Sequence, residues 1–134
     1  MEDIVWDKTL SIEVDEIDED HRRLVDLYNL LCHAVAEGES TDYIDALLEE
    51  LVSCTIWHFR HEERLMLKYK YDAFEEHKSE HRDLIDSVRE LQQKFHKENK
   101  LLTSEDIEYL SKWLTEHIVK NDMRMGFYLM TVMY

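Results

Sequence analysis

The sequence predicts an all-α fold, an up-down-up-down antiparallel four-helix bundle with an extended N-terminal arm. Three observations predict it. The 134 residues contain no proline and only two glycines, so the strongest helix breakers are nearly absent. Four segments repeat apolar residues with the helical period, and the links between them are short. The length fits a single domain, residues 1–134, and a hydrophobic content of 44% is enough for a buried core.

Each element has its own signal. Residues 1–18 show no sustained helical period, so we expect them to form an arm packed on the domain. We expect the first helix to stop near Gly38 and the second to begin after the capping signal "STD", residues 40–42. Thr103 and Asp106 can form a capping box at the start of the fourth helix, whose apolar C-terminal end is expected to be packed. The four expected helices span about residues 19–37, 41–69, 73–97 and 104–122 or beyond.

The charge of the chain limits its partners. A formal net charge of −15 repels nucleic acid and anionic membrane surfaces. No apolar run approaches the ~20 residues that span a bilayer, and the N-terminus shows no secretory signal. We therefore expect a cytoplasmic protein without membrane insertion. Cys32 and Cys54 lie in apolar helical stretches, which for an intracellular protein indicates buried reduced thiols.

Ionisable residues on the apolar faces of the helices are the strongest functional signal. On a helical wheel at ~100° per residue, His58 and Glu62 of the stretch "HFRHEERLM" face inward. His61 and Glu63 lie on the shoulders of the same helix, and we expect them to be solvated. The other helices add inward-facing residues of the same kinds, and the whole set is His21, His58, Glu62, His77, His81, His117 and Asp122.

His117 and Asp122 can share a centre only under one condition. They are five residues apart, which separates them by about 140° on a regular helix. A local π-type turn would let both side chains reach a common point, and such turns often occur at functional sites. We therefore expect a π-type turn here. Continuous α-helical bonding between the two residues would contradict it.

The seven inward-facing groups predict a metal site. Burying them without compensation would cost several kcal/mol each, more than the ~5–15 kcal/mol of a typical domain's stability. Imidazole and carboxylate suit iron, manganese or zinc, and seven ligands are too many for one ion. Two octahedral ions need about twelve positions, of which five imidazoles, two bridging carboxylates and a bridging oxide or hydroxide leave one open. That position, enclosed by apolar side chains, fits a small neutral ligand such as dioxygen, and we expect binding rather than catalysis.

At these positions the chain resembles the hemerythrins. The matching motifs are His21, "HFRHE", "HKSEH", "HIVKND", "WLTEHI" and the arm "W…LSIEVDEIDEDH", and the likeness covers the whole chain. The length and the link before the fourth helix are most similar to a single-domain bacterial hemerythrin. The resemblance implies a non-haem di-iron centre, bridged by oxide or hydroxide, that binds dioxygen reversibly for carriage, storage or delivery.

The resemblance also implies a role for each ligand and a pocket for dioxygen. The implied ligand roles are His77, His81 and His117 on the saturated iron, His21 and His58 on the open iron, and Glu62 and Asp122 as bridges. The implied pocket lies over the open iron. The matching positions, which ordinary core packing would also explain, are Leu24, Phe59, Trp113, Leu114 and Ile118.

The sequence departs from the family at two turns. The arm has Glu13 where a glycine is usual, and the "GYP" turn before the third helix reads Lys70, Tyr71 and Asp72. These departures concern the conformation of the two loops. They leave the ligand positions unchanged.

Other functions use similar residues. A sensor would use the same centre to report oxygen, nitric oxide or redox state to a protein partner. A ferritin-like di-iron oxidase or iron store would carry Glu-x-x-His on two helices, but no glutamate lies three residues before any histidine here. A zincin-type hydrolase would need a second histidine where "HEERL" has Leu65. Zinc or manganese could also occupy the same ligands.

Overall fold

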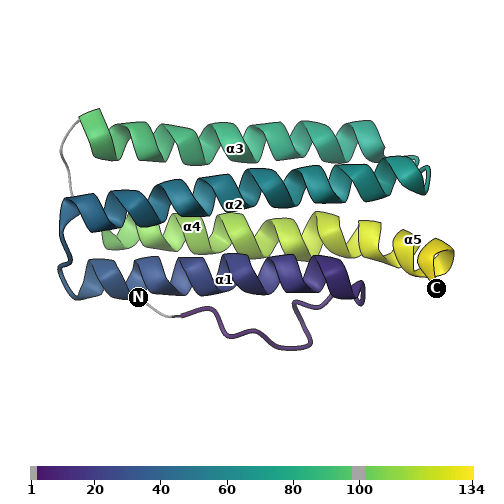
Figure 1. The fold of residues 1–134 in the computed structure, drawn as a ribbon, viewed down its shortest axis with the longest axis horizontal. Coiled ribbons are helices and arrows are strands. Elements are labelled where there is room, and N and C mark those ends of the chain that lie inside the picture. The colour runs from purple at the N-terminus through teal and green to yellow at the C-terminus, as the bar shows by residue number, and fades with distance from the viewer. Residues whose placement is uncertain (1–2, 98–101) are drawn as a thin grey trace.

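The computed structural model describes residues 3–97 and 102–134, and it confirms the predicted all-α four-helix bundle (Figure 1). α4, the short π-helical segment η1 and α5 follow one another without a break and together form the fourth helix of the bundle. The elements are α1 (Asp15–Ala36), α2 (Thr41–Lys68), α3 (Phe74–Lys97), α4 (Ser104–His117), η1 (Ile118–Asp122) and α5 (Met123–Met133).

The first helix begins earlier than its sequence pattern predicts. α1 starts at Asp15, so the predicted arm of residues 1–18 is too long by four residues. Val14 precedes the helix with extended backbone and makes no side-chain cap, so no capping residue marks this start. The amides of Ile17 and Asp18 already bond to the Val14 carbonyl, at 3.0 and 2.9 Å. Ile17 of this added turn is fully buried in the core, and such burial favours the longer helix.

The starts of α2 and α4 follow their capping signals. The Ser40 hydroxyl accepts a hydrogen bond from the Tyr43 amide at 3.2 Å. Thr103 and Asp106 form the predicted capping box, in which each side chain accepts from the amide of the other residue. The link residues 98–101 lie outside the part of the chain that the structure describes.

The N-terminal arm runs back along α1 (Figure 1). Ile4 exchanges hydrogen bonds with the Asn29 side chain, whereas Ile12 donates its amide to Asp18, 2.9 Å away. Ile12 is buried and lies against Gly126 of α5, where an added Cβ would come within 2.8 Å of the Ile12 Cβ and carbonyl oxygen. The arm therefore ties the beginning of the chain to its last helix.

Two helix ends use the same left-handed turn with different residues. At the end of α1, Gly38 has a φ of 71°, and the Gly38 and Glu39 amides bond back into the last helical turn. At the end of α2, Lys70 takes a φ of 57° and forms the same arrangement with Tyr71. Glu13 in the arm also has a positive φ, 61°. Both departures from the family's glycines thus keep the backbone conformation that glycine favours.

The core consists of apolar side chains from all parts of the bundle and the arm. Cys32 is buried, as predicted, whereas Cys54 is only partly buried, and the two form no disulfide with each other. None of the helices within residues 3–97 and 102–134 combines the length and apolar character needed to cross a membrane.

Candidate metal centre

The seven ionisable residues predicted to face inward all lie in the middle of the bundle. Each is at most 5% exposed. α1 supplies one of them, α2 and α3 supply two each, and the fourth helix supplies the remaining two. They form two groups of potential ligand atoms within 4.8 Å of one another. The three-histidine group is Glu62, His77, His81, His117 and Asp122, and the two-histidine group is His21, His58, Glu62 and Asp122.

Glu62 stands between the two groups. Its Oε1 lies 2.9 Å from His81 Nε2 and 3.4 Å from His77 Nε2. Its Oε2 lies 3.1 Å from His58 Nε2 and 3.6 Å from His21 Nε2. One carboxylate oxygen therefore faces each group of histidines.

Asp122 divides its oxygens in the same way. Its Oδ1 lies 3.0 Å from His117 Nε2 and 3.1 Å from His77 Nε2. Its Oδ2 lies 2.8 Å from His21 Nε2. Each carboxylate thus offers one oxygen to each group, so Glu62 and Asp122 could bridge two metal ions.

The predicted π-type turn is confirmed. Residues Ile118–Asp122 form a π-helix, and the Met123 amide bonds to the Ile118 carbonyl five residues earlier. This wider turn brings His117 and Asp122 to the same point, which a regular helix would not do.

His61, expected to be solvated, is instead hydrogen bonded to two acidic residues of α1. Asp20 of α1 accepts from His58 Nδ1 at 2.8 Å and contacts His61 Nδ1 at 2.6 Å. The other nitrogen of His61, Nε2, lies 2.8 Å from Glu16 Oε1. The side chain of His61 is 13% exposed. The prediction for His61 was wrong because helix α1 covers that shoulder of α2. A carboxylate only accepts, so Asp20 keeps the proton of His58 on Nδ1 and leaves Nε2 free for a metal.

Glu63, predicted to be solvated, is partly exposed but also contacts a histidine of the centre. Its Oε2 accepts from His81 Nδ1 at 3.0 Å, and its side chain is 21% exposed. Glu80 is placed in the same way, 3.4 Å from His117 Nδ1, and also accepts from Asn121. Sequence reasoning missed Glu80 and Asp20 altogether, because nothing in the helical period distinguishes them among 31 acidic residues.

The close packing of carboxylates and imidazoles shifts their pKa values. Burial by itself would lower the pKa of His58, but Glu62 and Asp20 outweigh it and raise that pKa to about 10. Burial of His77 is likewise outweighed by Asp122 and Glu62, which raise its pKa to about 9. Burial favours the neutral acid at Glu62, yet the surrounding histidines lower its pKa well below the usual range. In the absence of metal, these shifts favour the protonated form of His58 and His77 beside an ionised Glu62.

Several buried polar atoms of the cluster make no hydrogen bond of acceptable geometry. They include His58 Nε2, His117 Nε2, Glu62 Oε2 and Asp122 Oδ1. Buried polar atoms are normally paired, so such atoms need another partner. All four belong to the two groups that converge on the centre. Nitrogen and carboxylate donors of this kind fit a pair of iron ions.

A small buried cavity of about 10 Å³ adjoins the two-histidine group. That space holds roughly one water-sized molecule. All five residues predicted for the oxygen pocket line it, together with residues that sequence reasoning did not single out. The lining residues are His21, Leu24, Thr55, His58, Phe59, Leu84, Trp113, Leu114, His117 and Ile118.

The fold and the site match known proteins over most of the chain. The Hemerythrin family model, described as "Hemerythrin HHE cation binding domain", matches residues 13–126. The chain belongs to the hemerythrin family. A bacteriohemerythrin of Methylococcus capsulatus is 32% identical over 109 residues, which cover 81% of this chain and 82% of that protein. A bacteriohemerythrin of Pseudomonas paraeruginosa is 34% identical over 127 residues, 91% of this chain and 78% of that one. A crystal structure of wild-type hemerythrin has a TM-score of 0.86 at 30% identity and covers 94% of this chain and 97% of its own.

Membership of the family confirms the resemblance inferred from the ligand motifs. Hemerythrins bind dioxygen at a di-iron centre, and the cluster of histidines and carboxylates in this hemerythrin is positioned for metal binding. The family thus supplies the identity of the metal, which imidazole and carboxylate ligands by themselves leave open among iron, manganese and zinc.

Proposed function

We propose that this hemerythrin binds dioxygen reversibly, for carriage, storage or delivery, and does not turn it over. In this proposal His77, His81 and His117 hold one iron, His21 and His58 hold the other, and Glu62 and Asp122 bridge them. When bound, the iron pair supplies the redox chemistry that dioxygen binding requires. The observation that carries the proposal is the position of the small apolar cavity beside the two-histidine group.

The two groups of ligands are unequal in a way that supports this proposal. The three-histidine group offers five donor residues and the two-histidine group offers four. An open coordination position is therefore expected on the side of His21 and His58. Both of these histidines line the cavity, whereas His117 is the one lining residue that contributes only to the three-histidine group.

The lining of the cavity favours binding over catalysis. Thr55 carries a hydroxyl, but it donates to the Leu51 carbonyl at 2.7 Å. The indole N–H of Trp113 donates to the Leu84 carbonyl at 3.0 Å. Both polar groups are thus committed to the backbone, and the rest of the wall consists of aliphatic and aromatic carbon and of histidines. A wall of this kind excludes water and withholds the proton donors that reduction of dioxygen would consume.

Oxygen cycling of the loaded protein tests the proposal. The purified protein is loaded with ferrous iron, and its visible spectrum is recorded through repeated cycles of oxygen and vacuum. We expect an oxygen-dependent charge-transfer band that returns in each cycle. Irreversible loss of the band to a ferric product would favour an oxidase instead. A partner protein whose binding differs between the oxygenated and reduced forms would favour sensing.

Paired histidine variants locate the band at the proposed centre. His58→Ala should abolish it, because His58 is one of the two histidines beside the cavity. His33→Ala is the matched control, since the His33 side chain is 57% exposed and bonds only to Asp3 among the described residues. A band that persists in His58→Ala would show that the assignment of His58 is wrong.

A further inference from the structure

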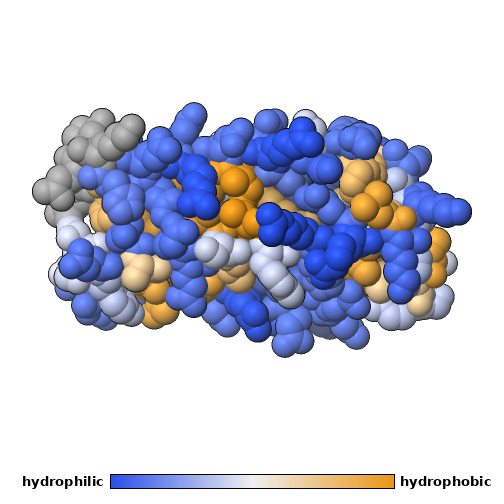
Figure 2. Space-filling view, turned by 45° about the horizontal axis from the view of Figure 1, so that its top comes forward, coloured by the Kyte–Doolittle hydropathy of each residue, from blue (hydrophilic) through white to orange (hydrophobic). Residues whose placement is uncertain are grey.

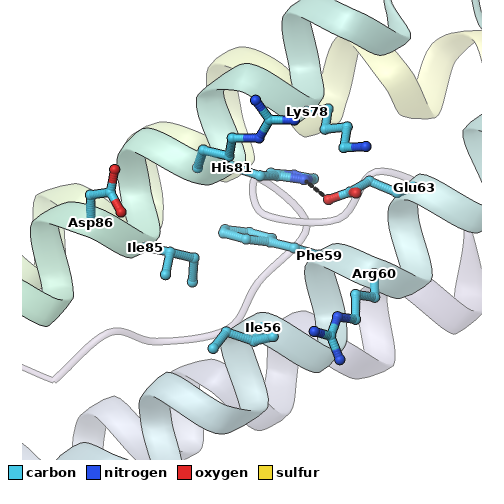
Figure 3. A pocket seen from close by; sticks show the side chains of 9 residues that line it. Ile56, Phe59, Arg60, Glu63, Lys78, His81, Ile85 and Asp86 are labelled. Atoms are coloured by element: carbon cyan, nitrogen blue, oxygen red, sulfur yellow. Dashed lines mark hydrogen bonds and ion pairs between the residues drawn. The ribbon is translucent and has the colours of Figure 1, made fainter.

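A second, larger pocket opens on the surface between α2 and α3 (Figure 3). Its volume is about 430 Å³, which lies within the ~300–1,000 Å³ typical of sites for small molecules. The proposed oxygen function does not use it. The residues that line it are Ile56, Phe59, Arg60, Glu63, Lys78, His81, Arg82, Ile85 and Asp86.

The floor of this pocket is apolar. Ile56 and Phe59 come from α2 and Ile85 comes from α3, and Figure 3 shows the three side chains converging. The Phe59 ring stacks on His81 with 3.8 Å between ring centroids and 4° between ring planes, so it is held in place. Phe59 also lines the small buried cavity, and an occupant of the outer pocket would touch the same ring.

The rim of the pocket concentrates positive charge on an acidic protein. The chain has 16 Lys and Arg against 31 Asp and Glu, yet Arg60, Lys78 and Arg82 all line this one pocket. Within residues 3–97 and 102–134, none of these three forms an ion pair with an acidic side chain. Figure 2, which brings α3 forward, shows apolar surface between strongly hydrophilic side chains in the middle of this face.

The acidic residues of the pocket offset only part of this charge. Glu63, which accepts a hydrogen bond from His81 Nδ1 at 3.0 Å, carries one negative charge against the three positive charges of Arg60, Lys78 and Arg82. Asp86 lies at one end of the pocket, beyond Ile85, and Lys78, Glu63 and Arg60 all lie toward the other end (Figure 3). The pocket is therefore polarised, with a cationic end and an apolar floor.

We propose that this pocket binds a small amphipathic anion, a carboxylate attached to an apolar ring or short chain. The apolar part lies on Ile56, Ile85 and the edge of Phe59. The carboxylate lies at the end of the pocket lined by Arg60 and Lys78, where their positive charge attracts it. Apolar contact supplies most of the affinity, and the charge selects an anion over a neutral analogue.

Calorimetric titration with 2-naphthoate tests the site in the intact, metal-loaded protein, and it does not depend on oxygen binding. We expect saturable binding. The double variant Arg60→Gln/Lys78→Gln should weaken it by about five- to tenfold, the effect of removing two partly exposed charge contacts. 2-Naphthalenemethanol is the neutral analogue, and it should bind the unmodified protein more weakly than 2-naphthoate does. In the double variant the two compounds should bind with equal affinity.

The matched control is Lys112→Gln/Arg124→Gln, which removes the same charge from other parts of the surface. Its affinity for 2-naphthoate should equal that of the unmodified protein. A third variant, Ile85→Glu, puts an acid on the floor and should abolish binding while circular dichroism shows the helices intact. No saturable heat with 2-naphthoate, equal weakening in both double variants, or equal affinity of the neutral analogue would overturn the proposal.

Discussion

Asp20 affects the metal centre without belonging to it. It accepts from His58 Nδ1 and also bonds to His61, so one carboxylate of α1 orients two histidines of α2. Glu63 and Glu80 do the same for His81 and His117. A carboxylate on the outer nitrogen of a ligating histidine fixes the ring and raises its basicity. The affinity of the centre for metal therefore depends on more residues than the seven that face it.

Replacing Asp20 tests this dependence. Asp20→Ala should weaken iron binding by about 10- to 100-fold, because His58 loses the acceptor that orients it. The measurement is a competition for ferrous iron against a chelator of known affinity. Asp26→Ala removes the same charge from an exposed position of α1 and should leave the affinity unchanged. Equal affinities for the two variants would mean that Asp20 has no role in metal binding.

At the scale of the helices, the C-terminal ends of α1 and α2 form the same turn but have different residues at its left-handed position. α1 ends with Gly38 in the left-handed conformation and α2 ends with Lys70 in the same conformation. The hydrogen bonds of the two turns are equivalent, so the turn at Lys70 is required by the fold and the side chain only adds strain.

Lys70→Gly should therefore stabilise the protein. The left-handed conformation costs a side-chain-bearing residue ~1–2 kcal/mol, part of which is offset by the greater freedom of glycine in the unfolded chain. We expect a gain of about 0.5–1 kcal/mol in the free energy of unfolding, measured by urea denaturation. Lys70→Ala removes the charge but keeps the strain, and it should change little. A loss of stability on Lys70→Gly would show that the side chain makes a stabilising contact.

The contact between the arm and α5 depends on Gly126. A Cβ there would meet Ile12 at 2.8 Å, on both its backbone and its side chain. Gly126→Ala should cost about 1–3 kcal/mol of stability, the usual effect of overpacking, although alanine is the better helix former. Thermal unfolding compared with Thr131→Ala, an exposed change in the same helix, checks this. No loss of stability would mean that the arm can move aside freely.

At the scale of the whole molecule, the metal centre links stability to pH. Without metal, the raised pKa values of His58 and His77 stabilise the folded state because those histidines hold their protons more tightly than in the unfolded chain. This contribution is complete below the unfolded pKa of 6.5 and is lost as the pH rises to about 10. The lowered pKa values of Glu62 and Asp122 contribute stability that is present above their unfolded values and lost in acid.

Metal binding should reverse the pH dependence at the alkaline end. Ligating histidines must be neutral, so at pH 7 iron has to displace protons from at least His58 and His77. We expect the metal-free protein, prepared with a chelator, to be less stable at pH 9 than at pH 6.5. Iron retention should increase over the same pH range. Denaturant unfolding with and without chelator measures the stability of the metal-free and iron-loaded proteins at each pH, and the difference between them reports how firmly iron is held. Stability of the chelated protein that rises with pH would contradict the assignment.

The sequence by itself determined which residues of each helix face inward, because the helical period relates sequence spacing to direction around one axis. It therefore identified the bundle, the seven residues of the centre and the π-type turn, and the ligand motifs led to the family. It could not determine contacts between helices. The early start of α1, the partners of His61 and Glu63, the position of Glu80 and the surface pocket depend on how neighbouring helices are placed. Only the tertiary structure decided these, because residues far apart in sequence meet there and no period within one helix encodes their distance.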